Sequence, residues 1–74
     1  MRDGLKYKVY WYNPVQKENQ LVATFKHQGD AWLYCNTLYE MAKKDHKSMQ
    51  IMLYQDQHMA ENYFKHSLIK EWRL

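Results

Sequence analysis

The sequence contains few of the residues that mark specialised classes of protein, with one Cys, one Pro and two Gly among 74 residues. A single Cys excludes a disulfide framework and a Cys-based zinc knuckle, and the scarcity of Pro and Gly excludes a collagen-like repeat or a low-complexity linker. No run of apolar residues approaches the roughly 18 that a membrane span needs, and the N-terminus lacks an apolar signal core. We therefore expect a soluble, cytoplasmic protein that has no membrane partner.

Aromatic residues are abundant by contrast, with seven Tyr, three Trp and two Phe. A chain of this length buries only about 60% of its unfolded surface, so large side chains suit its thin core. Tyr side chains in excess of what the core can hold are typical of binding surfaces. The net charge of +3 is small for a nucleic-acid-binding domain, which usually has a stronger basic footprint.

Three segments have the alternating pattern of β-strands. Residues 5–12 (LKYKVYWY) and 20–26 (QLVATFK) flank a polar stretch that opens with Asn13-Pro14, which predicts an antiparallel hairpin. Residues 48–54 (SMQIMLY) alternate in the same way and predict a third strand.

Residues 27–44 have the period of an amphipathic helix, with Asp30 in the first turn, where a negative charge favours the helix dipole. The apolar positions at helical spacing are Ala31, Cys35, Leu38 and Ala42. Cys35 lies on this apolar stripe, so we expect it to be a buried structural thiol rather than a nucleophile.

Residues 56–74 are interpreted as a second amphipathic helix. Phe64, Leu68 and Trp72 recur at a spacing of four, and Ile69 widens the stripe. A stripe of this kind must be buried, because an exposed apolar patch marks an interaction site or an aggregation hazard. We expect it to pack within its own chain, with a second copy or a foreign partner as the alternatives.

The predicted fold is a single α+β domain over residues 1–74 with the element order β-β-α-β-α. It has a small three-stranded antiparallel sheet, in the order 2-1-3, with the first helix packed on one face and a C-terminal amphipathic helix. The residues expected beneath the first helix are Tyr7, Val9, Trp11, Leu21, Phe25, Ile51 and Leu53. Whether the second helix covers the other face stays open.

No constellation of residues in the sequence indicates catalysis, so we expect neither catalytic residues nor a cofactor. No two carboxylates are brought to one cleft by the pattern, and a domain this small has little room for a substrate pocket. The four histidines are too scattered for a metal site, which needs three or four ligands in a fixed geometry. They are His27, His46, His58 and His66.

The sheet face opposite the first helix is the strongest candidate for binding, unless the second helix or a second copy covers it. The candidates for protein interaction are Tyr10, Tyr12, Met52 and Tyr54 on this face and Leu33 on the outer side of the helix. The candidates for nucleic-acid binding are Lys6, Lys8 and Lys26 with Tyr10 and Tyr12, because flat aromatic faces stack bases and Lys contacts phosphates.

These features favour a small non-enzymatic protein-interaction module, such as an inhibitor, an adaptor or an oligomerising accessory protein. Its expected partner is a protein, and a homodimer is one form that this could take; no small-molecule substrate is expected. The alternative hypothesis is a module that binds single-stranded nucleic acid through the Lys and Tyr residues of the sheet. A compact domain of this kind is typical of small phage or mobile-element products.

Overall fold

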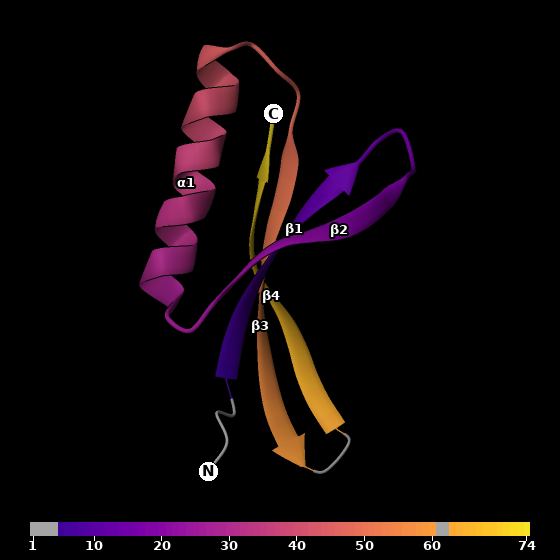
Figure 1. Cartoon of the computed structure of the whole chain (residues 1–74), viewed down its shortest axis with the longest axis vertical. Coiled ribbons are helices and arrows are strands. Elements are labelled where there is room, and N and C mark those ends of the chain that lie inside the picture. Colours follow the sequence, from indigo (N-terminus) through magenta and orange to yellow (C-terminus); the bar gives the residue numbers. More distant parts are fainter. Residues whose placement is uncertain (1–4, 61–62) are drawn as a thin grey trace.

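Two antiparallel hairpins, joined through a helix, form one sheet (Figure 1). The elements are β1 (Leu5–Asn13), β2 (Glu18–Phe25), α1 (Gln28–Lys44), β3 (Gln50–Ala60) and β4 (Tyr63–Arg73). The computed structural model describes residues 5–60 and 63–74. The sheet has the order β2-β1-β3-β4, and every neighbouring pair is antiparallel.

The first hairpin turns at Asn13, as the sequence predicts. The Asn13 side-chain oxygen accepts hydrogen bonds from the backbone N–H groups of Val15 at 2.9 Å and Gln16 at 3.3 Å. Lys17 closes the turn with a φ of 57°, in the left-handed region. Asn is favoured at the start of a turn, where Asn13 lies, because its side chain can accept hydrogen bonds from the backbone of the same turn.

The prediction of a C-terminal helix over residues 56–74 is wrong, and so is the three-stranded sheet that depended on it. β3 continues to Ala60, and Tyr63–Arg73 forms a fourth strand paired with it. A spacing of four does not distinguish the two structures, because residues four apart share a face on a strand as well as on a helix. The Phe64 side chain, which belonged to the predicted stripe, lies outside the described residues.

Two irregularities in strand pairing decide which side chains face α1. In β2, Ala23 pairs with Val9 but Leu21 pairs with Tyr10, so Val22 is an extra residue in the ladder. Leu21 therefore lies on the face opposite α1, which corrects the prediction that the helix covers it. In β4, a similar shift pairs Leu68 with Tyr54, so Leu68 and Trp72 lie on opposite faces of the sheet.

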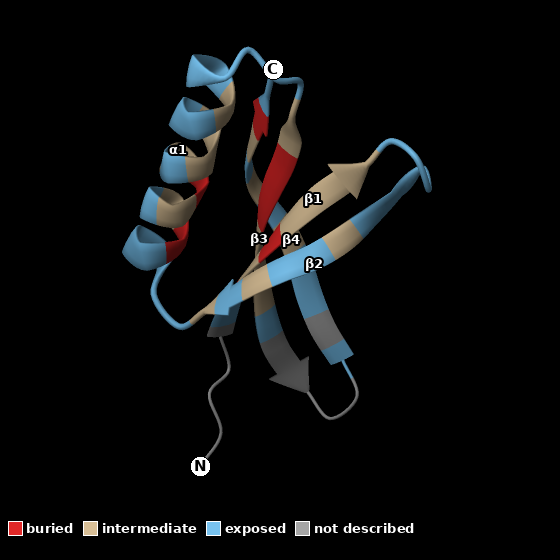
Figure 2. Ribbon diagram, turned by 45° about the horizontal axis from the view of Figure 1, so that its top comes forward, coloured by how far each residue is buried: buried red, intermediate tan, exposed pale blue. Residues whose placement is uncertain are grey.

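α1 packs against one face of the sheet and the core lies between them (Figure 2). The most completely buried side chains are Val9, Ala31, Cys35, Ile51 and Leu53. The predicted burial of Cys35 is confirmed, since its exposed fraction is 0%. Trp11, which was expected in the core, is only partly buried and packs against it.

Trp72 of β4 is the aromatic side chain that joins the last strand to the helix. It is 4% exposed, and its indole N–H donates a hydrogen bond to the Asn36 side-chain oxygen at 3.0 Å. Its ring lies 5.3 Å from that of Trp32, at 73°. The Lys70 ammonium lies over both rings, 5.0 Å from Trp32 and 5.2 Å from Trp72. Together these contacts fasten β4 to α1.

We expect Trp72→Ala to lower the free energy of unfolding by about 3–5 kcal/mol, because it leaves a cavity and an unpaired Asn36 amide. A loss of that size is comparable to the whole free energy of unfolding of a small domain, so most molecules of the variant would be unfolded at room temperature. Urea unfolding followed by circular dichroism measures it. Leu33→Ala is the control, because Leu33 is 67% exposed and its truncation should change stability by less than about 0.5 kcal/mol. Equal free energies of unfolding for the two variants would contradict the anchoring role of Trp72.

Candidate protein-binding surface

The sheet face opposite α1, here called the open face, carries an apolar patch at its centre. The patch consists of Tyr10, Leu21, Met52, Tyr54 and Leu68. No helix covers this face within residues 5–60 and 63–74. Even so, Met52 is 7% exposed, because the neighbouring side chains of the sheet enclose it. Leu21 and Leu68 are each 52% exposed and form the accessible part of the patch.

Three aromatic rings pack against one another on the open face. Tyr10 and Tyr54 meet edge to face, with ring centroids 5.6 Å apart at 88°. The imidazole of His66 stacks on Tyr54 with a centroid separation of 4.2 Å and an interplanar angle of 11°. Such pairs hold rings in fixed orientations, so one face of Tyr54 is occupied by the protein itself.

The carboxylate of Asp56, on β3, contacts two basic side chains of the open face. Asp56 forms an ion pair with Lys8, whose Nζ lies 2.9 Å from Oδ2, and its other oxygen pairs with His66. Partial burial acts to raise the pKa of Asp56, but the hydrogen bonds and positive charges of Lys8 and His66 outweigh it and hold the pKa below its usual value. The hydrogen bond to Asp56 raises the pKa of Lys8, against the opposing effect of its own desolvation.

A second ion pair lies at the other end of the patch. Glu71 accepts a hydrogen bond from the Gln50 amide and pairs with Arg73 at 2.9 Å. Lys8 and Arg73 therefore each have an acidic partner on the open face. The patch thus has an ion pair at each end, and each pair contains one positive and one negative group.

Three of the four predicted sheet candidates come together in the patch, namely Tyr10, Met52 and Tyr54. Tyr12 lies farther along the same face, where it lines a cavity of about 510 Å³ with Pro14 and other residues at the sheet end. For nucleic-acid binding, Lys6 and Lys8 lie on the open face, whereas Lys26 follows the end of β2.

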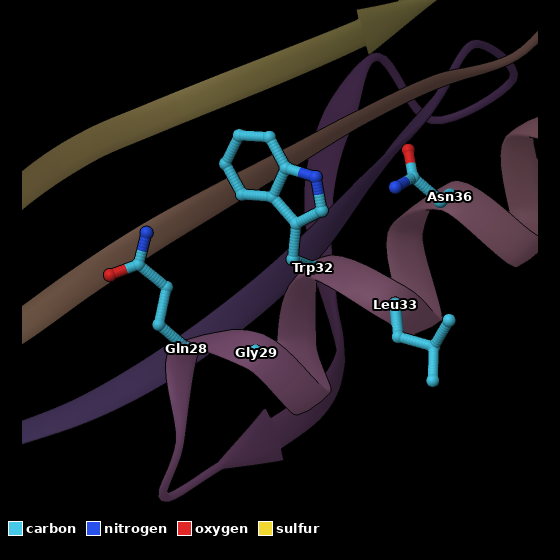
Figure 3. Close-up of a pocket in the computed structure, with 5 residues that line it drawn as sticks. All are labelled: Gln28, Gly29, Trp32, Leu33 and Asn36. Carbon is cyan, nitrogen blue, oxygen red and sulfur yellow. The ribbon is translucent and has the colours of Figure 1, made fainter.

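Leu33 is far from this patch in the fold, because it lies on α1, on the other side of the sheet. It borders a shallow cavity of about 520 Å³ with Gln28, Gly29, Trp32 and Asn36 (Figure 3). Its side chain points away from the Trp32 ring. Trp32 and Asn36 are already used to hold Trp72, which leaves Leu33 as an isolated exposed leucine.

Sequence reasoning missed Leu21, Asp56, His66 and Leu68 as members of the open face. The last three fell in the segment interpreted as a helix, and Leu21 was placed beneath α1. Asp56 continues the alternation of Met52 and Tyr54, and that signal could have extended β3. The bulge that turns Leu21 outward leaves no comparable signal in the sequence.

No side chain in the described part of the chain indicates nucleophilic or metal chemistry. Burial raises the pKa of the Cys35 thiol to about 11, so it stays protonated at neutral pH. No group of three or more His, Cys, Asp or Glu side chains among the described residues could hold a metal ion. The His58 side chain lies outside those residues.

No protein-family model matches the sequence, and no curated protein or solved structure matches it significantly. Across the ranges that the structure describes, no helix combines the length and apolar character needed to cross a membrane.

We expect Asp56→Asn to lower the free energy of unfolding by about 1 kcal/mol near neutral pH, because the amide loses the ionic attraction of the carboxylate to Lys8. The pKa of Asp56 in the folded state lies below its ordinary value of 3.8, so its contribution is present above that value and is lost as the pH falls through the folded-state pKa. Urea unfolding at a series of pH values should show the two proteins converging in acid.

Glu40→Gln is the matched control, because Glu40 is an exposed carboxylate on α1. It should leave both the stability and its acid dependence close to those of the parent. If the stability difference caused by Asp56→Asn stayed constant down to acid pH, the ion pairs of Asp56 would not be its source.

Proposed function

We propose that this protein is a non-enzymatic interaction module that binds another protein through the apolar patch of its open face. The observation that carries this proposal is the pair Leu21 and Leu68, each 52% exposed, beside the aromatic residues Tyr10 and Tyr54. Monomeric proteins seldom expose contiguous apolar groups of this kind unless the patch binds something. Tyr residues at the centre of such a patch are frequent energetic hot spots.

The charges around the patch define the chemistry of the partner. The Lys8–Asp56 pair lies at one end and the Glu71–Arg73 pair at the other, so the border has both signs. A protein surface with an apolar centre and its own mixed charges would fit this arrangement, and the border would act mainly on specificity and association rate. Whether binding inhibits the partner or links it to others depends on what else that partner contacts.

The same geometry weakens the case for single-stranded nucleic acid. A base-stacking platform needs open ring faces, but His66 occupies one face of Tyr54. Phosphate binding needs free cations, and Lys8 is paired with Asp56. Within the ranges that the structure describes, Lys6 is the cation that continues the basic side of this face beyond Lys8, and this is a weak electrostatic footprint.

We expect Leu21→Ser together with Leu68→Ser to abolish capture of the partner while leaving the fold intact, since both side chains are half exposed. Tagged parent and variant proteins would be used to capture binding proteins from the native host, followed by quantitative mass spectrometry and thermal melts. Leu33→Ser is the matched control, because it removes an exposed leucine from the outer side of α1. A protein retained equally by all three chains would not be bound by the patch.

Binding to single-stranded oligonucleotides separates the two functions. We expect the parent protein to bind them only weakly near physiological salt, with Lys8→Ala causing little further loss because Lys8 is neutralised by Asp56. Fluorescence anisotropy over a range of salt concentrations measures this. A tight complex with a steep salt dependence, lost in the Lys8 variant, would support the nucleic-acid alternative instead.

A further inference from the structure

A cleft on the α1 side of the sheet lies between the second half of the helix and the first hairpin, which diverges from the end of α1 (Figure 1). Its volume is about 390 Å³, within the range of about 300–1,000 Å³ that small-molecule sites occupy. Apolar side chains from α1, β1, β2 and β3 form most of its lining. The open face lies on the other side of the sheet, so an inference about this cleft does not rest on the proposed function.

The bulge in β2 contributes to the wall of the cleft. Val22, the extra residue of the ladder, lines the cleft and is 43% exposed, whereas its neighbour Leu21 lies on the open face. Bulges recur beside functional sites because they change the direction of a side chain. Trp11 and Ile51 line the cleft from the two central strands. The irregularity of β2 thus adds an accessible apolar side chain to a wall that is otherwise part of the core.

The apolar lining favours an aromatic occupant. Trp11 and Tyr34 contribute rings, and Met41 and Met49 contribute thioethers, which both pair favourably with another ring. Met41 is 58% exposed, so this part of the cleft is open to solvent. A volume of about 390 Å³ holds on the order of a dozen waters at about 30 Å³ each. A molecule with two fused rings and one polar group has a similar number of non-hydrogen atoms.

The polar residues of the lining all come from the end of α1 and the loop that follows it. They are Asp45, Lys47 and Ser48, and all three are exposed. An occupant would therefore have its apolar part between the helix and the hairpin and its polar group at this loop.

The loop has a net positive charge. Residues 43–47 contain three lysines and one aspartate, and none of these forms an ion pair with another described residue. A rise of about 1.5 Å per helical residue keeps their backbones within the Debye length of about 8 Å, so their charges act together. The lysines also exceed the roughly half negative charge of the helix end. The polar end of the cleft therefore favours an anionic group.

We infer that this cleft binds a small aromatic carboxylate. The rings of the ligand would lie against Trp11 and Tyr34, and its carboxylate would pair with the Lys47 ammonium and accept a hydrogen bond from the Ser48 hydroxyl. Asp45 disfavours a ligand with a second negative charge near the first. A molecule of this size in an open cleft binds with a dissociation constant on the order of 0.1–1 mM.

The experiment uses 2-naphthoate as the probe, with two analogues that keep the same rings: the neutral 2-naphthamide and the cationic 2-naphthylmethylamine. Binding to the full chain is followed by two-dimensional NMR of the backbone amides. We expect naphthoate to bind about fivefold more tightly than the amide, because a single screened ion pair has an effect of this size, and the amine to bind most weakly. The shifted amides should be those of Val22 and residues 38–49.

Substitutions at the loop test the recognition of the anion. Lys47→Ala should weaken naphthoate binding by about fivefold and leave the amide unchanged, whereas Asp45→Asn should tighten naphthoate binding by about twofold. Lys6→Ala is the matched control, because it removes the same charge from an exposed position on the open face and should change neither affinity. Ala42→Phe fills the cleft and should weaken both ligands by at least about tenfold.

Circular dichroism checks that each variant folds. The substitutions at Lys47 and Asp45 are at exposed positions, so the test stays decisive if Ala42→Phe does not fold. The inference is overturned if the three probes bind with equal affinity, or if none of them gives saturable shifts. It is also overturned if the shifts centre on the open face, or if Lys47→Ala and Lys6→Ala weaken naphthoate binding equally.

Discussion

The fold depends on the attachment of β4 to α1 through Trp72. The indole is buried, hydrogen bonded to Asn36 and packed against Trp32, and the Lys70 ammonium lies over both rings. Without this contact, the last strand would be held by its pairing with β3 and by the partly buried Ile69, which also packs against the core. In a domain of this size, the stabilisation supplied by one buried Trp is a large fraction of the small net free energy of unfolding.

In the described part of the chain, a single helix on a four-stranded sheet leaves one face without a covering layer, and this face is the proposed binding surface. A sheet that faces water on one side usually carries polar residues there. Here the open face carries Tyr10, Tyr54 and Met52 at its centre, with the half-exposed Leu21 and Leu68 beside them. The core of the protein thus lies on the α1 face of the sheet, and a second apolar cluster lies on the open face.

The charges on the open face favour one of the two proposed functions over the other. Asp56 neutralises Lys8 and holds His66, which in turn occupies a face of Tyr54. One carboxylate therefore reduces both the free positive charge and the open aromatic area that a nucleic acid would use. The remaining surface is apolar at its centre and mixed in charge at its border, and this chemistry is better suited to a protein partner.

The local pattern of the sequence was sufficient to predict β1, β2 and α1. In β1 and β2 the apolar residues alternate with a period of two, and in α1 they follow the helical period, so the two patterns cannot be confused there. It also placed Tyr10, Met52 and Tyr54 on one face. Tertiary structure alone decided Tyr63–Arg73, since an apolar spacing of four fits a helix and a strand equally well until β3 supplies a neighbour. It also decided the facing of Leu21 and Leu68, because a single extra residue in a ladder turns every side chain beyond it to the opposite side of the sheet.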